Sequence, residues 1–99
     1  MYFIIDCDDS DAGLALRPEH RSAHLAHLAR VRESILTAGP KLNGAGEPCG
    51  SLLVIDFVDR AAAEAFARED PYAQAGVFAK VTVMPYRQTL PHEATGRGE

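Results

Sequence analysis

Residues 51–57 read Ser-Leu-Leu-Val-Ile-Asp-Phe and form the clearest predicted β-strand in the chain. Residues 52–55 are all apolar, and Val54 and Ile55 are β-branched, which favours a strand. Successive side chains of a strand point to opposite faces of its sheet. An unbroken apolar run therefore predicts a strand whose two faces are both covered.

Three further strands are predicted around this one. Residues 2–7 and 77–86 are rich in β-branched and aromatic side chains, and residues 41–42 could form a short strand. Residues 8–13 (DDSDAG) are predicted to form a polar turn. Residues 43–50 contain three glycines and a proline, which indicates a hairpin loop.

Two helices are predicted between the strands. The first spans residues 18–38, with Pro18 in its first turn and Gly39-Pro40 ending it. The second spans residues 60–69, with Asp59 as its N-cap. The Asp70-Pro71 pair ends that helix, because a residue before proline avoids helical backbone angles, and a short helix over residues 71–75 follows.

The element order β-α-β-β-α-β predicts an α+β, ferredoxin-like fold with an antiparallel sheet. Two helices can cover only one face of that sheet. Since the strands at residues 2–5 and 52–55 are apolar on both faces, the second face needs a cover that this chain does not supply. A second copy packing sheet against sheet is the simplest cover, so we expect a homodimer.

Size and charge limit the functional classes. The 99 residues fit one domain, expected over residues 1–90, while residues 91–99 lack large apolar side chains and are expected to form a flexible tail. The net charge is −4, without a cluster of basic residues, which argues against nucleic acid or an anionic membrane as the main partner. No leader or apolar membrane-spanning run is visible, so a cytoplasmic location is expected.

Neither acidic residues nor histidines predict a metal site. Asp6, Asp8, Asp9 and Asp11 begin like a calcium loop, but the glycine and glutamate that an EF-hand requires at positions six and twelve are Asp11 and Arg17. The histidines at positions 20, 24 and 27 share a helical stripe, but its ends lie ~10 Å apart along the axis. Three such residues cannot meet at one ion, and a histidine pair has no carboxylate or cysteine at a helpful spacing nearby, so no metal is expected. No glycine-rich phosphate loop opens a helix, and no cofactor is expected.

The two cysteines, Cys7 and Cys49, form no CxxC motif and are expected to be reduced thiols. The fold would bring the end of the first strand beside the start of the third, so a redox pair between them is a minor alternative.

His24 and Asp70 are the candidate chemical groups. His24 lies beside the leucine stripe of the first helix, where it could reach a pocket and keep one ring nitrogen accessible. Asp70 sits at a helix break that Pro71 holds fixed. A histidine–carboxylate pair is a common minimum for acid–base chemistry near neutral pH. The alternatives are a half-buried helix histidine bonded to a carbonyl and an ordinary turn aspartate.

Ordered motifs along residues 2–90 resemble the YciI-like (YCII-related) family. The resemblance rests on the order of five motifs: residues 21–28 (RSAHLAHL), 37–40 (TAGP), 50–52 (GSL), 70–78 (DPYAQAGVF) and 81–86 (VTVMPY). The resemblance implies a dimeric α/β-barrel fold. It also implies an active site of one histidine and one aspartate, which map to His24 and Asp70.

The resemblance extends to the wider dimeric-barrel group, which includes isomerases, lyases and cofactor-free oxygenases acting on small, often aromatic or enolic, molecules. By that analogy, the leading hypothesis is a cofactor-independent lyase or isomerase. His24 would be the general base and Asp70 its orienting partner. Arg17 is expected to bind the substrate as an anion anchor. Ser51 is expected to bind it through a hydroxyl at the start of a strand, and not to act as a nucleophile. The alternatives are a module that binds a small ligand without chemistry and a purely structural dimer.

Overall fold

The structure is a computed structural model that describes residues 1–91, and most of the expected tail, residues 92–99, lies outside the described residues. Its elements follow the order β-α-β-β-α-β, with a 3₁₀ turn after the first helix and a short third helix. They are β1 (Tyr2–Asp9), α1 (Gly13–Ala29), η1 (Arg32–Ser34), β2 (Ile35–Leu42), β3 (Pro48–Asp56), α2 (Arg60–Glu69), α3 (Pro71–Gln74) and β4 (Phe78–Tyr86).

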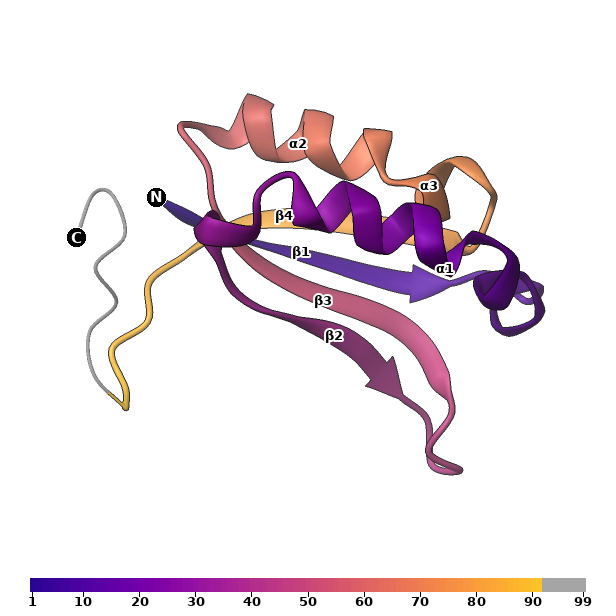
Figure 1. The fold of residues 1–99 in the computed structure, drawn as a ribbon. Coiled ribbons are helices and arrows are strands. Elements are labelled where there is room, and N and C mark those ends of the chain that lie inside the picture. Colours follow the sequence, from indigo (N-terminus) through magenta and orange to yellow (C-terminus); the bar gives the residue numbers. More distant parts are fainter. Residues whose placement is uncertain (92–99) are drawn as a thin grey trace.

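The four strands form one antiparallel sheet in the order β2-β3-β1-β4, and the helices cover one face of it (Figure 1). The fold is therefore the predicted ferredoxin-like α+β arrangement. The strand predicted at residues 51–57 corresponds to β3, which ends at Asp56 and lies beside β1 in the middle of the sheet.

The core lies between the sheet and the helices. Along β1 the buried residues Phe3, Ile5 and Cys7 alternate with less buried ones, so every second side chain points toward the helices. The main core cluster comprises Ile5, Cys7, Leu28, Leu53, Ile55, Phe66 and Ala67.

Within residues 1–91, no helix lies over the opposite face of the sheet (Figure 1). Leu52, Met84 and Tyr86 on this face are each 36–39% exposed. Lys41 crosses from β2 to bind the carboxylates of Asp6, at 2.7 Å, and Asp8. Ion pairing with Lys41 lowers the pKa of the Asp8 carboxyl.

The predicted first helix is wrong at both ends. It begins at Gly13 rather than Pro18, and Pro18 lies in its second turn. It ends at Ala29, and Ile35–Leu42 forms the edge strand β2 rather than the last helical turns. An edge strand tolerates Pro40 because one row of its N–H groups has no partner strand.

Two predicted loops are partly strand. Asp8 and Asp9 extend β1, and residues 48–50 begin β3. The predicted start and end of the second helix are confirmed. Asp59 caps α2 by accepting a hydrogen bond from the Ala62 N–H at 2.8 Å, and α2 ends before Asp70-Pro71. No helix in residues 1–91 combines the length and apolarity needed to cross a membrane.

Candidate functional site

The structure brings His24 of α1 and Asp70 together, although 46 residues separate them in the sequence. His24 Nδ1 lies 2.8 Å from Asp70 Oδ1 and 3.0 Å from Oδ2. His24 is 6% exposed and Asp70 is 2% exposed. Because an ionised carboxylate can only accept, Nδ1–H must be the donor, and a neutral imidazole then keeps an unprotonated Nε2.

The helix break at Asp70 fixes this carboxylate. Asp70 has extended backbone angles and caps α3, accepting a hydrogen bond from the Tyr72 N–H at 2.9 Å through Oδ1. The proline that follows begins α3 and holds the turn rigid. Asp70 therefore joins the end of α2, the start of α3 and the imidazole on α1.

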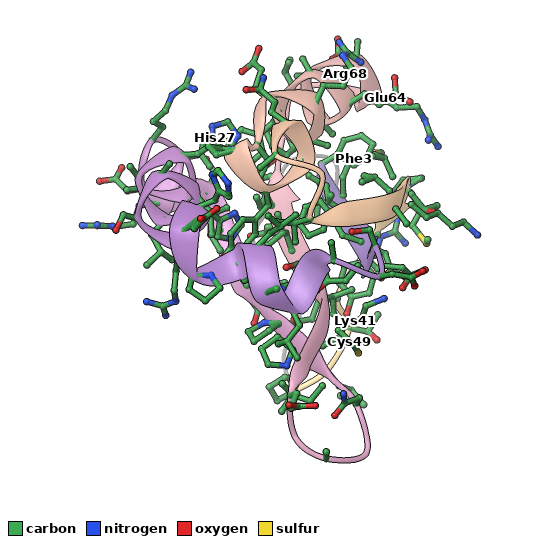
Figure 2. All side chains as sticks on the ribbon, turned by 90° about the vertical axis from the view of Figure 1, so that its right-hand side faces the viewer. Phe3, His27, Lys41, Cys49, Glu64 and Arg68 are labelled. Atoms are coloured by element: carbon green, nitrogen blue, oxygen red, sulfur yellow. The ribbon has the colours of Figure 1, made fainter. Side chains whose placement is uncertain are left out.

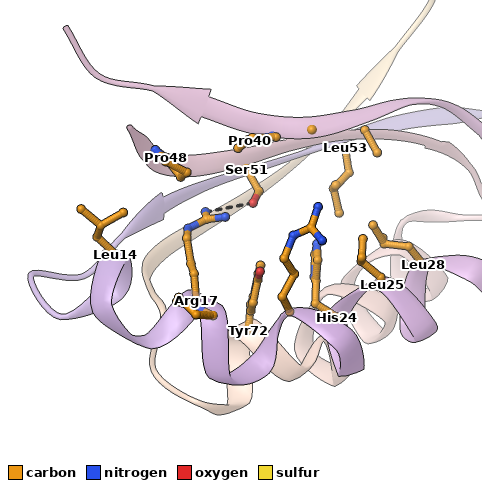
Figure 3. A pocket seen from close by; sticks show the side chains of 14 residues that line it. Leu14, Arg17, His24, Leu25, Leu28, Pro40, Pro48, Ser51, Leu53 and Tyr72 are labelled. Atoms are coloured by element: carbon orange, nitrogen blue, oxygen red, sulfur yellow. Dashed lines mark hydrogen bonds between the residues drawn. The ribbon is translucent and has the colours of Figure 1, made fainter. Parts of the chain in front are cut away.

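Tyr72 is a site residue that the sequence analysis did not single out. Its ring stacks on His24 with 4.0 Å between centroids and 10° between planes, and the Arg17 guanidinium carbon lies 5.0 Å from its centroid. Figure 3 shows Tyr72 between these two side chains. Burial raises the pKa of the Tyr72 hydroxyl, while the positive charges of Arg17 and Arg21 oppose that shift. The one sequence feature that could have identified Tyr72 as a site residue is its position directly after Asp70-Pro71.

Arg17 lies in the site, but its charge is already paired. Its Nε and Nη2 donate to the two oxygens of Asp9 at 2.8 and 2.9 Å. Nη2 also donates to the Gly50 carbonyl at 2.6 Å and to Ser51 Oγ at 3.1 Å. The hydrogen bonds to Asp9 raise the pKa of Arg17. Ser51 is buried inside β3 rather than placed at a strand end.

His24, Tyr72, Arg17 and Ser51 line a cavity of about 510 Å³ between α1, α3 and strands β2 and β3 (Figure 3). The polar groups on its surface come from Arg17, Arg21, His24, Ser51 and Tyr72. The remaining wall is built from Leu14, Pro18, Leu25, Leu28, Ala38, Gly39, Pro40, Pro48 and Leu53. Such a combination of apolar walls and a few converging polar groups is typical of small-molecule sites.

The other two helix histidines have different surroundings. His27 donates from Nε2 to the Phe66 carbonyl at 2.9 Å and stacks on the Phe66 ring, so it joins α1 to α2 (Figure 2). His20 is partly exposed and lies 3.7 Å from Glu19. Within residues 1–91, no three histidine, cysteine or acidic side chains gather as metal ligands would.

The two cysteines are free thiols in contrasting environments. Cys7 is 1% exposed in the core, whereas Cys49 is exposed near Lys41 at the β2–β3 hairpin (Figure 2). Burial, with the negative charges of Asp70 and Asp6, raises the pKa of the Cys7 thiol to about 12. A raised pKa makes the thiolate scarce near neutral pH, and the structure forms no disulfide between the two.

The chain is similar to known proteins in sequence and in fold. The YCII-related domain family matches residues 1–87. Protein YciI of Escherichia coli O6:H1 is 35% identical over 98 residues, covering 91% of this chain and all of that protein. An uncharacterized protein of Haemophilus influenzae is 34% identical over 98 residues, again covering 91% of this chain and all of that protein.

A solved structure is also similar, with a TM-score of 0.85 and 26% identity over 94% of this chain and all of that one. It is the 5-chloro-2-hydroxyhydroquinone dehydrochlorinase TftG of Burkholderia phenoliruptrix AC1100, in complex with 2,5-dihydroxybenzoquinone. An enzyme is thus built on this fold. The predicted resemblance is confirmed, and the chain belongs to the YCII-related domain family.

Proposed function

We propose that this protein is a cofactor-independent enzyme of the lyase or isomerase type, acting on a small enolic or aromatic molecule. The observation that carries the proposal is the buried His24–Asp70 pair, whose imidazole lines the cavity while the carboxylate lies behind it. Asp70 is not part of the cavity surface, so His24 is the member of the pair that a ligand would meet.

The geometry supports a general-base role for His24. With Nδ1–H bonded to Asp70, the free Nε2 can take a proton from a C–H or O–H group of a bound molecule, and Asp70 stabilises the imidazolium that results. In an elimination, the electron pair left on the substrate forms a new double bond as the leaving group departs with its own pair. In an isomerisation, the proton returns at another atom.

TftG supports this reaction class by analogy, since a dehydrochlorinase removes hydrogen chloride and the compound in its name is a hydroxylated aromatic. The leucine and proline side chains of the cavity wall offer apolar surface to the ring of such a compound. At 26% identity, substrate and leaving group do not transfer to this chain.

We also propose that the active form is a homodimer. The exposed face carries Leu52, Met84 and Tyr86 next to the partly buried Ile4, and a second copy packed sheet to sheet would remove these side chains from water. Light scattering should give twice the monomer mass for the wild type. Leu52→Lys with Met84→Lys should give a folded monomer, whereas a monomeric wild type would contradict the proposal.

The direct test is a turnover screen with chlorinated hydroquinones and other small enols, followed by absorbance and chloride release. His24→Gln and Asp70→Asn should lower turnover by about 10²–10⁴-fold, the usual contribution of a positioned acid or base. His20→Gln is the matched control on the same helix and should retain turnover. Wild-type protein that binds such compounds and releases them unchanged would favour the ligand-binding alternative.

A further inference from the structure

We propose that Arg21 anchors the substrate, so that the molecule bound beside His24 carries an anionic oxygen, either a carboxylate or an ionised enol or phenol. This inference rests on the proposed function of the same cavity and adds the charge class of its substrate. It also moves the anion-binding role that the sequence suggested for Arg17 to a different side chain.

The position of Arg21 favours this role. Arg17, Arg21 and His24 follow one another at spacings of four and three residues on α1, which places them on one face of the helix. All three line the cavity. Arg21 is exposed, unlike its two buried neighbours, so its guanidinium can meet a ligand that enters from solvent.

The distribution of charge distinguishes Arg21 from Arg17. Arg17 uses its Nε and Nη2 donors on Asp9, Gly50 and Ser51, and the Asp9 carboxylate already balances its charge, so Nη1 is the part of the group left for other partners. Within the described part of the chain, no carboxylate forms an ion pair with Arg21. Its five N–H donors remain available in a planar arrangement that matches a carboxylate.

The location also suits the proposed chemistry. When His24 removes a proton from a planar substrate, the electron pair left behind spreads onto a conjugated oxygen, where negative charge increases in the transition state. A guanidinium one helical turn from His24 can hold that oxygen. The apolar part of the ring would pack against Leu25, Leu28 and Leu53 on the cavity wall.

Salicylate and salicylamide test this inference, because they have nearly the same shape and differ in charge. Binding is measured by NMR titration of isotope-labelled wild type, Arg21→Gln, Arg21→Lys and Arg32→Gln. Arg32 is the control, since it is exposed, lies on η1 and does not line the cavity. Because Arg21 is exposed, its replacement should not prevent folding.

We expect saturable binding of salicylate at the cavity, weakened about tenfold or more in Arg21→Gln, partly restored in Arg21→Lys and unchanged in Arg32→Gln. Salicylamide should bind more weakly than salicylate and should not respond to Arg21→Gln. Equal binding of the two compounds, unchanged salicylate affinity in Arg21→Gln, or no saturable salicylate binding would each overturn the inference.

His24→Gln separates this inference from the proposed function. Anion binding that depends on Arg21 should persist within about twofold when His24 is replaced, because the imidazole is not the anchor. Arg21-dependent binding without turnover by the wild type would contradict the proposed function alone. Turnover that depends on His24, with binding indifferent to Arg21, would contradict this inference alone.

Discussion

The phenol ring of Tyr72 lies parallel to the imidazole of His24, with 4.0 Å between their centroids. The two residues also share one acceptor, because Asp70 Oδ1 binds both His24 Nδ1–H and the Tyr72 backbone N–H. A single turn between α2 and α3 therefore supplies both the carboxylate that orients His24 and the ring that restricts its motion.

Replacing Tyr72 should separate its packing from its hydroxyl. Tyr72 is 3% exposed, so Tyr72→Leu should lower the free energy of unfolding by about 2–4 kcal/mol through lost ring contacts. Tyr72→Phe keeps the stack and should stay within about 1 kcal/mol of the wild type. Urea unfolding measures both, and the ring-current shift of the His24 protons should survive only in Tyr72→Phe. Equal stability of the two variants would contradict the packing role.

Asp70 should determine which His24 nitrogen carries the proton. At a pH where His24 is neutral, ¹⁵N NMR of the wild type should show the Nδ1–H tautomer, because Nδ1 faces a carboxylate that can only accept. In Asp70→Asn the side-chain amide can donate as well as accept, so the Nε2–H form should become populated. Asparagine still caps helices, which limits the loss of stability. An identical tautomer in both proteins would argue against the orienting role.

The sequence predicted the element order and the His24–Asp70 pair but misplaced β2. Ile35 and Leu36 extend the apolar spacing of the preceding helix, so local pattern alone assigned them to it. Their strand conformation depends on pairing with β3, where Ile35 lies opposite Ile55. Such pairing depends on residues about twenty positions away, which a local pattern cannot show.

The ion pair of Arg17 was missed for a similar reason. Asp9 belongs to an acidic run that resembles a solvated turn, and its partner is known only once α1 folds back over the end of β1. The Asp9 carboxylate neutralises the charge of Arg17, which the sequence analysis had suggested as an anion anchor in the cavity. Within residues 1–91, the tertiary fold therefore determines that Arg17, and not Arg21, is paired with a carboxylate.

A double-mutant cycle should show that Arg17 and Asp9 act as a unit. Their side chains are 10% and 7% exposed, so removing either partner leaves a charge with little water around it. Arg17→Met and Asp9→Asn should each lower the free energy of unfolding by about 3 kcal/mol, and the double variant by much less than their sum. Chemical denaturation checks this. Additive losses would mean that the pair contributes no coupling.

Gly50 should not tolerate a side chain. A Cβ at this position would collide with the Cys7 carbonyl oxygen and the Lys41 side chain, whereas one at Gly39 of β2 would have no atom within 4 Å. Gly50→Ala should therefore lower the thermal midpoint by several degrees and disturb the carbonyl that binds Arg17, while Gly39→Ala should change it little. Thermal unfolding of the two variants tests this prediction. Equal midpoints would contradict it, because they would mean that the strands move apart to admit the Cβ at little cost in free energy.

Alkylation should distinguish the two thiols. Iodoacetamide at pH 8 should modify Cys49 and spare Cys7, because Cys49 is exposed and Cys7 is buried with a pKa of about 12. Mass spectrometry should show one adduct on the folded protein and two after denaturation. Oxidant should not convert the folded chain to an intramolecular disulfide, and the appearance of one would revive the redox pair.

The same burial predicts a loss of stability at alkaline pH. The ordinary thiol pKa is 9.0, and folding raises that of Cys7 to about 12. Between these values the unfolded chain releases the proton and the folded chain keeps it, so the free energy of unfolding falls as pH rises, by at most about 1.4 kcal/mol per pH unit. Below pH 9 both states are protonated and the stabilisation is fully present.

Cys7→Ala tests this prediction, because the fall in the free energy of unfolding that is due to Cys7 should vanish in the variant. Urea unfolding of the variant and the wild type is compared between pH 8 and about 11. The contribution of lysines and tyrosines is shared by the two proteins and cancels in the comparison. Parallel profiles for the two proteins would mean that Cys7 ionises as readily in the folded core as in the unfolded chain.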